Sequence, residues 1–416
     1  MTERLRERLR ALPRLAGSAT AMYVAALAMS GFAILLTVAL PPHERGLLVA
    51  TTTSATIAVA IGGLSLETFL LAQGRGWLLA TAGRRSFAVY AATVPLSAVL
   101  GWLFAWYSAQ ASPGIAAAGA VCMAAGTMPG AAGLTLGGFR SVYQYRAAFA
   151  TVTPLLYLVL IVASVSSAGT WLLAWLACQA LMAVAMWLRH GRPMAAMLRR
   201  ASGEPERLSR MGLTHAGAVA HIFTYRFDQL ALSRYQGPDA LAVYSLAMNA
   251  VEFAQAGAVV QAQRALGDHD EGSADRLAGL LRKAVYLAVG LGALVLVGLA
   301  GIGAVAHAYR GALLLGALLL PRSIAVAVDK VLSARLVNLG RERTTAVIAT
   351  CAALVAVVSY SLVAARYAAV GVAVVSVVLF LLHGTASALA LRAGGRPRVV
   401  AGPAKAAVGS GVGERA

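Results

Sequence analysis

The sequence predicts an all-α protein that crosses a membrane many times. Of its 416 residues, 59% are hydrophobic and only 12% are charged, which is more apolar surface than one soluble core can bury. Apolar runs of about 20 residues recur along the whole chain, and such a run can cross a hydrocarbon layer about 30 Å thick. The runs are continuous rather than alternating, which excludes a transmembrane β-barrel.

About twelve of these runs are predicted to be transmembrane helices. The first is longer than the apolar segment of a signal peptide, so it is expected to remain in the protein as a span. The predicted spans cover residues 17–40, 47–72, 86–108, 114–137, 146–167, 169–188, 211–232, 240–263, 283–307, 311–333, 344–365 and 367–391.

The basic residues predict which end of each helix faces the cytoplasm. The chain holds 35 Lys and Arg residues, and the cytoplasmic loops of membrane proteins are enriched in both. With both termini placed in the cytoplasm, most of them fall in inside segments. The short outside loops receive only Arg45, Arg234, Arg310 and Arg366. Topology and attraction to anionic membrane lipids therefore explain the net charge of +19, and no nucleic acid partner is expected.

The twelve spans are predicted to form two lobes of six helices. The expected parts are a first lobe, a basic cytoplasmic linker, a second lobe and a disordered cytoplasmic tail, at residues 1–188, 189–210, 211–392 and 393–416. The turn that begins at Pro42 resembles the turn that begins at Pro238. Because each lobe has an even number of spans, such repeats would share one orientation and be related by an axis along the membrane normal. Transporters built in this way often bind substrate between the halves.

Charged residues within the predicted spans are the main candidates for function. A charge near the bilayer centre costs at least about 2.5–3.5 kcal/mol, so it normally faces a partner or a water-filled cavity. Arg226 and Asp228 lie two residues apart in the seventh span, on well-separated helix faces, so each needs a partner elsewhere. In the eighth span, Asn249 and Glu252 belong to one polar stripe.

The tenth span adds further ionisable side chains. Arg322 and Asp329 are seven residues apart and share a helix face, with Lys330 next to Asp329. In the first lobe the main charge within a span is Glu67. Asp329, Lys330 and Glu67 are candidates for ion coupling or gating, although Lys330 lies near the inner surface, where a lysine also extends toward water.

Two interpretations of these charges remain open. In the first, they stabilise helix packing as ion pairs, Arg226 with Glu252 and Asp228 with Lys330 or Arg322. In the second, they line a hydrated cavity in which the guanidinium groups bind an anion, because their planar forks match phosphate oxygens.

The segment Tyr225–Phe253 resembles the seventh and eighth spans of bacterial polysaccharide flippases. These are the Wzx-type members of the multidrug/oligosaccharidyl-lipid/polysaccharide (MOP) exporter superfamily. In that family an Arg-x-Asp motif near the outer end of the seventh span precedes a short G-P-x-x-L-A-x-Y turn. The turn LPPHERGLLVA after the first span also resembles that family. The matching residues of the first motif and turn are Arg226, Asp228, Gly237, Pro238, Leu241, Ala242 and Tyr244.

The resemblance implies a transporter of the bacterial inner membrane that serves surface polysaccharide export. It would move an undecaprenyl-diphosphate-linked oligosaccharide to the outer leaflet by rocking its two lobes, without a cofactor and without making or breaking a bond. Polysaccharide assembly proteins would be its partners. The predicted substrate-binding residues are Arg226, Asp228, Asn249, Glu252 and Arg322.

Other functions are open as alternatives. A drug or metabolite exporter of the same superfamily would need an aromatic, acidic cavity rather than a cationic one. The first span carries no charge, whereas lipid II flippases carry an Arg-Asp pair there and drug/cation antiporters often an acid. A membrane polysaccharide polymerase or ligase is less favoured, because the outside loops are short. The chain has no phosphate-binding G-x-x-x-x-G-K motif and no metal-ligand spacing stands out.

Overall fold

The chain forms α-helices and short 3-10 turns throughout its described part. A computed structural model describes residues 19–65, 84–108, 111–136, 139–198, 206–255, 258, 261–262 and 274–393. Within these ranges there is no β-strand. The all-α prediction is therefore confirmed for the described residues.

The described residues of the first half form six helices. Two of them begin at a proline, a residue that suits the first turn of a helix because its missing N–H would have no partner there. The helices are α2 (Ala19–Leu36), α3 (Pro42–Gly62), α5 (Arg84–Ser108), α6 (Pro113–Thr135), α7 (Phe139–Val162) and α8 (Ala168–Leu198), with the 3-10 turn η1 (Thr37–Ala39) between α2 and α3.

The second half contains longer helices, two of which are broken at one residue. The elements are α9 (Glu206–Phe253), α11 (Ala274–Val305), η2 (His307–Tyr309), α12 (Gly311–Asn338) and α13 (Glu342–Ala393). Helix α9 is interrupted at Gly237, with φ 82° and ψ −179°, and α13 at Ala368, with φ 51° and ψ −153°. Glycine adopts a positive φ readily, whereas alanine does so at a steric cost.

The break at Gly237 falls in the turn predicted between the spans 211–232 and 240–263, and the break at Ala368 lies two residues after the turn predicted between the spans 344–365 and 367–391. With 48 residues in α9 and 52 in α13, a straight helix would be roughly 70–80 Å long at 1.5 Å per residue, more than twice the hydrocarbon thickness. Eight helices of the described chain are long and apolar enough to cross a membrane. The protein is therefore a multi-pass membrane protein, while the number of twelve spans and the side on which the termini lie stay predictions.

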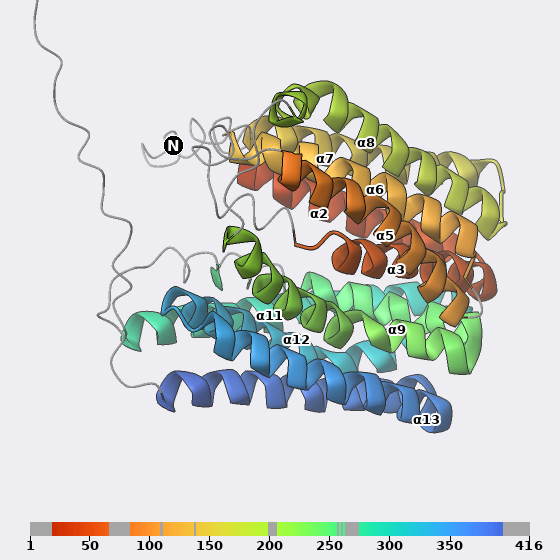
Figure 1. Cartoon of the computed structure of the whole chain (residues 1–416). Helices are drawn as coiled ribbons and strands as arrows, with labels where there is room; N and C mark the ends of the chain where they lie inside the picture. The colour runs from red at the N-terminus through yellow and green to blue at the C-terminus, as the bar shows by residue number, and fades with distance from the viewer. Residues whose placement is uncertain are drawn as a thin grey trace, which may run out of the picture.

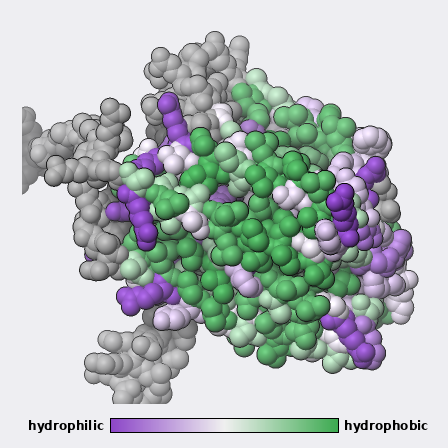
Figure 2. Space-filling view, turned by 90° about the horizontal axis from the view of Figure 1, so that it is seen from below, coloured by the Kyte–Doolittle hydropathy of each residue, from purple (hydrophilic) through white to green (hydrophobic). Residues whose placement is uncertain are grey.

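The outer surface carries large apolar side chains, as a lipid-facing surface does. Figure 2 shows a broad hydrophobic face with polar residues gathered toward its two edges. Val162, Leu188 and Val305 are 85%, 81% and 89% exposed. A soluble protein rarely exposes contiguous apolar area of this extent, so the surface itself indicates a surrounding bilayer.

The helices gather in two groups, with α2 to α8 in one and α9 to α13 in the other (Figure 1). Helices α3 and α9 pack against each other where the groups meet. The described residues also include buried apolar clusters within each group. Whether the two groups are separate lobes with the predicted boundaries stays a prediction.

The two turns predicted to be repeats of each other meet at this interface. His43 Nδ1 lies 3.4 Å from a carboxylate oxygen of Asp239, and these residues are 196 positions apart, the same offset as between Pro42 and Pro238. Gly46 of α3 lies directly against the backbone of Pro238, so closely that a Cβ atom at Gly46 would overlap that carbonyl group. Equivalent parts of the two halves therefore contact each other.

Replacing Gly46 tests this backbone contact. We expect Gly46→Ala to lower the free energy of unfolding by about 1–3 kcal/mol, the usual cost of overpacking. Gly114→Ala is the matched control, because Gly114 also lies in the first turn of a helix and a Cβ atom there meets nothing within 4 Å. Thermal unfolding of the purified variants in detergent measures both changes, and equal melting temperatures would contradict the close approach.

Candidate functional site

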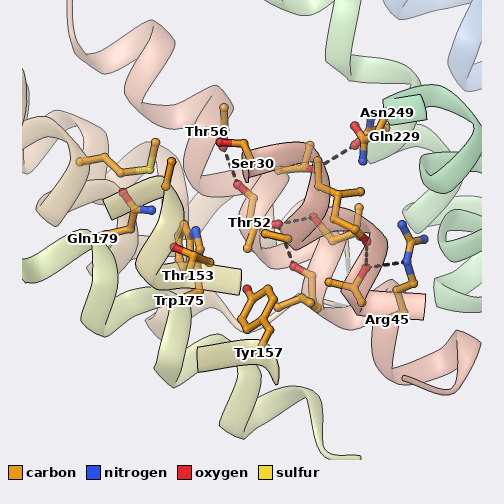
Figure 3. A pocket seen from close by; sticks show the side chains of 18 of the residues that line it. Ser30, Arg45, Thr52, Thr56, Thr153, Tyr157, Trp175, Gln179, Gln229 and Asn249 are labelled. Carbon is orange, nitrogen blue, oxygen red and sulfur yellow. Dashed lines mark hydrogen bonds between the residues drawn. The ribbon is translucent and has the colours of Figure 1, made fainter. Parts of the chain in front are cut away.

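A polar cavity of about 510 Å³ lies between the two groups of helices. Its walls come from α2, α3, α6, α7 and α8 of the first group and from α9 of the second (Figure 3). Its charged lining residues, among those the structure describes, are Arg45 and Arg226, and no acidic residue lines it. Its amide and hydroxyl groups come from Gln179, Gln229, Asn249, Ser30, Thr37, Thr52, Thr53, Thr56, Thr153 and Tyr157.

Threonines of α3 supply much of the polar wall. Thr52 and Thr56 are one helical turn apart and share a face. Each donates its hydroxyl hydrogen to a carbonyl of its own helix, Thr52 to Leu48 at 2.9 Å and Thr56 to Thr52 at 2.8 Å. This local bonding satisfies the donor within the membrane and leaves the oxygen lone pairs as acceptors. The wall can thus accept hydrogen bonds from a ligand rich in hydroxyl groups.

Arg45 lies in the first turn of α3 and is fully buried, although the sequence assigns it to an outside loop. Its Nε donates to the hydroxyl of Thr37 at 2.9 Å. Its Nη1 donates to the hydroxyl of Ser245 at 3.0 Å and to the carbonyl of Ala242 in α9, so the side chain joins the two groups of helices. Its Nη2 is buried and has no hydrogen-bond partner among the residues that the structure describes.

A second unpaired donor belongs to Gln229 of α9. Its Oε1 accepts a hydrogen bond from Thr53 of α3 at 2.9 Å, while its Nε2 is buried and has no partner in the described part of the chain. An unmade bond at a buried polar group costs about 1–3 kcal/mol, and a charged group costs more. Because Arg45 and Gln229 both line the cavity, a ligand with acceptor oxygens could satisfy both nitrogens after a small side-chain rotation.

Arg226 reaches the cavity from the opposite side and is paired. Its Nη2 lies 2.7 Å from Oε2 of Glu252, and its Nη1 lies 3.4 Å from Oδ1 of Asn249. The predicted ion pair between Arg226 and Glu252 is therefore confirmed. Their side chains are 26% and 21% exposed, so this pair lies at the edge of the cavity and not in a sealed core. Arg226 and Asn249 line the cavity, and Glu252 lies behind Arg226.

An apolar groove of about 460 Å³ adjoins the polar cavity. It lies between α2, the second part of α9 and α11, and its walls include Phe32, Leu246, Phe253 and Leu299. Ile34 and Asn249 line both spaces. A ligand with a polar head and an apolar chain would find the two environments next to each other.

Two other predicted binding residues, Asp228 and Arg322, are fully buried in the second half and lie outside the cavity lining. Asp228 accepts hydrogen bonds from the hydroxyl of Tyr244 at 2.6 Å and from the backbone N–H of Gln229 at 2.7 Å, and not from Lys330 or Arg322. The Arg322 guanidinium packs against two neighbouring rings, 5.3 Å from that of Tyr225 and 4.7 Å from that of Phe380, and also donates to the sulfur of Met248. Their role in binding substrate stays a prediction.

The candidates for ion coupling lie apart from the cavity. Asp329 is 2% exposed and accepts hydrogen bonds from the hydroxyls of Ser333 at 3.2 Å and Ser387 at 2.8 Å. Lys330 donates to Oε1 of Gln255 at 3.4 Å. Glu67 lies outside the described residues.

The sequence analysis missed the part of the site that the first half supplies. It considered charges within spans, and the first half has few. The available signal was the polar run Thr51–Ser54 followed by Thr56, which is unusual inside a membrane helix. The chemistry of the assembled cavity is that of a binding site: guanidinium and amide donors, hydroxyl acceptors and the aromatic rings of Tyr157 and Trp175.

Solved structures with the same architecture are transporters. The lipid II flippase MurJ in an inward closed conformation superposes with a TM-score of 0.64 at 12% identity, over 90% of this chain and 87% of that one. The eukaryotic MATE transporter AtDTX14 gives 0.53 at 14% identity, over 93% and 96%. A mutant of the Vibrio cholerae MATE transporter VcmN gives 0.50 at 14% identity, over 90% and 97%.

The sequence itself matches no protein-family model and no curated protein. Identities of this size show a common fold and nothing finer. The chain therefore has the fold of these transporters, and membership of the MOP superfamily and of its Wzx-type branch stays a prediction.

Proposed function

We propose that this protein is a transporter that flips a polyprenyl-diphosphate-linked oligosaccharide to the outer leaflet of a bacterial inner membrane. Transport would proceed by alternating access of the cavity between α2 to α8 and α9 to α13. The proposal depends most on one observation: the cavity lining contains two arginines and no carboxylate among the described residues.

The cationic lining suits a diphosphate. Arginine binds phosphate oxygens through paired N–H groups, and the buried Nη2 of Arg45 has no partner within the described protein. Gln229 adds a neutral donor from the same region. A lipophilic cation would be repelled by both arginines, so a drug exporter of the usual cationic specificity is the less favoured alternative.

The remaining cavity lining suits a sugar. The oxygens of Thr52 and Thr56 can accept hydrogen bonds from ligand hydroxyls, and Gln179 can both donate and accept. The rings of Tyr157 and Trp175 supply apolar faces against which a sugar ring can pack. At about 510 Å³ the cavity has the size of a pocket for a small ligand, enough for the diphosphate and the first sugars of a longer chain.

The apolar groove offers a place for the lipid chain. It meets the polar cavity at Ile34 and Asn249, so a diphosphate near Arg226 would lie close to apolar walls. The polyprenyl chain could then stay in contact with hydrocarbon while the polar head crosses.

Deletion of the gene in the source bacterium tests the function directly. We expect the surface polysaccharide to be lost and its lipid-linked precursor to accumulate on the inner leaflet. A polymerase would instead leave short lipid-linked units on the outer leaflet, and a drug exporter would leave both lipid and polysaccharide unchanged. The labelled lipids are extracted from cells with and without prior treatment by an enzyme that reaches only the outer leaflet. The fraction of lipid that the enzyme modifies separates the three outcomes.

Neutralising the cavity arginines should weaken binding of the diphosphate. For Arg45→Gln and Arg226→Gln we expect the Kd of the purified protein for a polyprenyl diphosphate to rise about 10- to 100-fold, since a hydrogen bond to a charged group contributes about 1.5–3 kcal/mol. Arg234→Gln is the control, because Arg234 is exposed beyond the cavity. Titration calorimetry measures all four proteins, and an unchanged Kd in both cavity variants would overturn the proposed anion site.

Exchanging the partners of the Arg226–Glu252 pair separates binding from folding. Arg226→Glu alone places two like charges together and should lower the melting temperature. Adding Glu252→Arg should restore the pair and the melting temperature. It should not restore transport, because position 252 does not line the cavity and its cation would face away from the ligand. Full polysaccharide export by the double variant would show that Arg226 only stabilises helix packing.

A further inference from the structure

The polar cavity has two chemically different ends. In Figure 3, Arg45, Gln229 and Asn249 lie on one side of the pocket and Gln179 lies on the other. Arg226 bonds Asn249, so both arginines belong to the first side, where the two groups of helices meet. Arg45 and Arg226 are also the charged residues of the described lining. The end at Gln179 therefore has no charged side chain among the described residues.

This neutral end is formed by Thr153 of α7 and by Trp175 and Gln179 of α8. Trp175 and Gln179 are four residues apart and share a helix face. The indole ring offers an apolar surface, and the amide next to it can both donate and accept hydrogen bonds. Among the side chains drawn in Figure 3, no hydrogen bond occupies Gln179. An apolar ring beside a free amide suits a sugar, which has C–H faces and a rim of hydroxyl groups.

Helix α7 adds a backbone acceptor to this end. Pro154 lies inside α7 and has no N–H to donate to the carbonyl of Ala150, four residues earlier. Ala150 lines the cavity, as does Thr153 one turn later. A carbonyl freed in this way inside a membrane needs a donor from another group or from a ligand. A hydroxyl group can donate to it, whereas a carboxylate has no hydrogen to give.

The Trp175 ring is held in place by its neighbours. A Cβ atom at Gly119 of α6 would overlap this ring, so the ring lies directly against the backbone of α6. Trp175 is 9% exposed and belongs to a buried cluster with Ala55 and Ala120. A large ring in close-packed surroundings has little freedom to rotate, so it forms a fixed wall of the cavity.

We propose that the neutral end is a subsite for the first sugar of the cargo and that it selects an uncharged sugar. This inference rests on the proposed function, which places the diphosphate at the arginines. A uronic acid would bring a carboxylate to an end without a cation, and an amino sugar would bring an ammonium group to a cavity without a carboxylate. Burial of an unpaired charge is costly. Trp175 and Gln179 are thus residues that determine specificity.

The selection is tested with three polyprenyl diphosphates that carry glucose, glucuronic acid or glucosamine, at a pH where the amine is protonated. Titration calorimetry of the purified full-length protein should give a Kd for the glucose lipid at least about tenfold lower than for the other two. Gln179→Lys should remove or reverse the preference over glucuronic acid, because it places a cation at the neutral end. Gln144→Lys is the matched control, since Gln144 is an exposed glutamine of α7 outside the lining. Equal Kd values for the three lipids, or an unchanged preference in Gln179→Lys, would overturn the proposal.

A second variant tests the wall without changing any charge. Gly119→Ala should displace the Trp175 ring and raise the Kd for the glucose lipid about two- to tenfold, with no change for a polyprenyl diphosphate that carries no sugar. Gly114→Ala in the same helix is the control, because a Cβ atom there meets nothing within 4 Å. An equal loss for the sugar-free lipid would contradict the role of Trp175 as a sugar wall.

Soluble sugars test the neutral end separately from the diphosphate. Methyl glucoside at millimolar concentration should change the indole fluorescence of the wild type relative to Trp175→Phe, and methyl glucuronide should not. This result without binding of any diphosphate lipid would place the fault in the proposed function and leave the subsite intact. Lipid binding that is weakened by Arg45→Gln but shows no preference among the three sugars would uphold the proposed function and overturn the subsite.

Discussion

A charged side chain within a hydrocarbon layer must have a partner or water, and this constraint arranges the polar interior of the protein. It is met in three ways. Arg226 pairs with Glu252 at the edge of the cavity, Arg322 packs against the neighbouring rings of Tyr225 and Phe380, and Asp228 accepts a hydrogen bond from the hydroxyl of Tyr244. Of these, only the first leaves a charge where a ligand can reach it, which concentrates the proposed binding function at the interface of the two helix groups.

Arg45 both joins the two groups of helices and offers a donor to a ligand. Through Nη1 it bonds α9, and so holds the two groups of helices together beside Gly46 and Pro238. Its Nη2 is a buried donor with no hydrogen-bond partner among the described residues. This costs free energy when no ligand is bound and favours the binding of an anion. A ligand that attracts this guanidinium would compete with its bonds to Ala242 and Ser245. Anion binding and separation of the two groups are thereby linked in one side chain.

Helix α9 connects the cavity with the buried side chains of α12 and α13. Arg226 and Gln229 face the cavity, whereas Tyr225 contacts Arg322 and Phe380 toward α12 and α13. Since Tyr225 and Arg226 belong to the same helical turn, a shift of one moves the other. The buried rings make this connection stiff, because close-packed interiors transmit small displacements rather than absorb them.

The sequence alone determined the all-α membrane class and the approximate helix bounds, because apolar run length expresses both directly. It offered the Arg226–Glu252 pair only as part of one of two interpretations, which the structure then decided. It also placed a turn at Gly237. The tertiary structure decided which polar residues share one space. Arg45 became part of the cavity through contact with α9, and Arg322 was enclosed by Phe380, a residue of another helix far along the chain. Such contacts depend on how helices far apart in the sequence pack against each other, and residue spacing within one helix does not predict this packing.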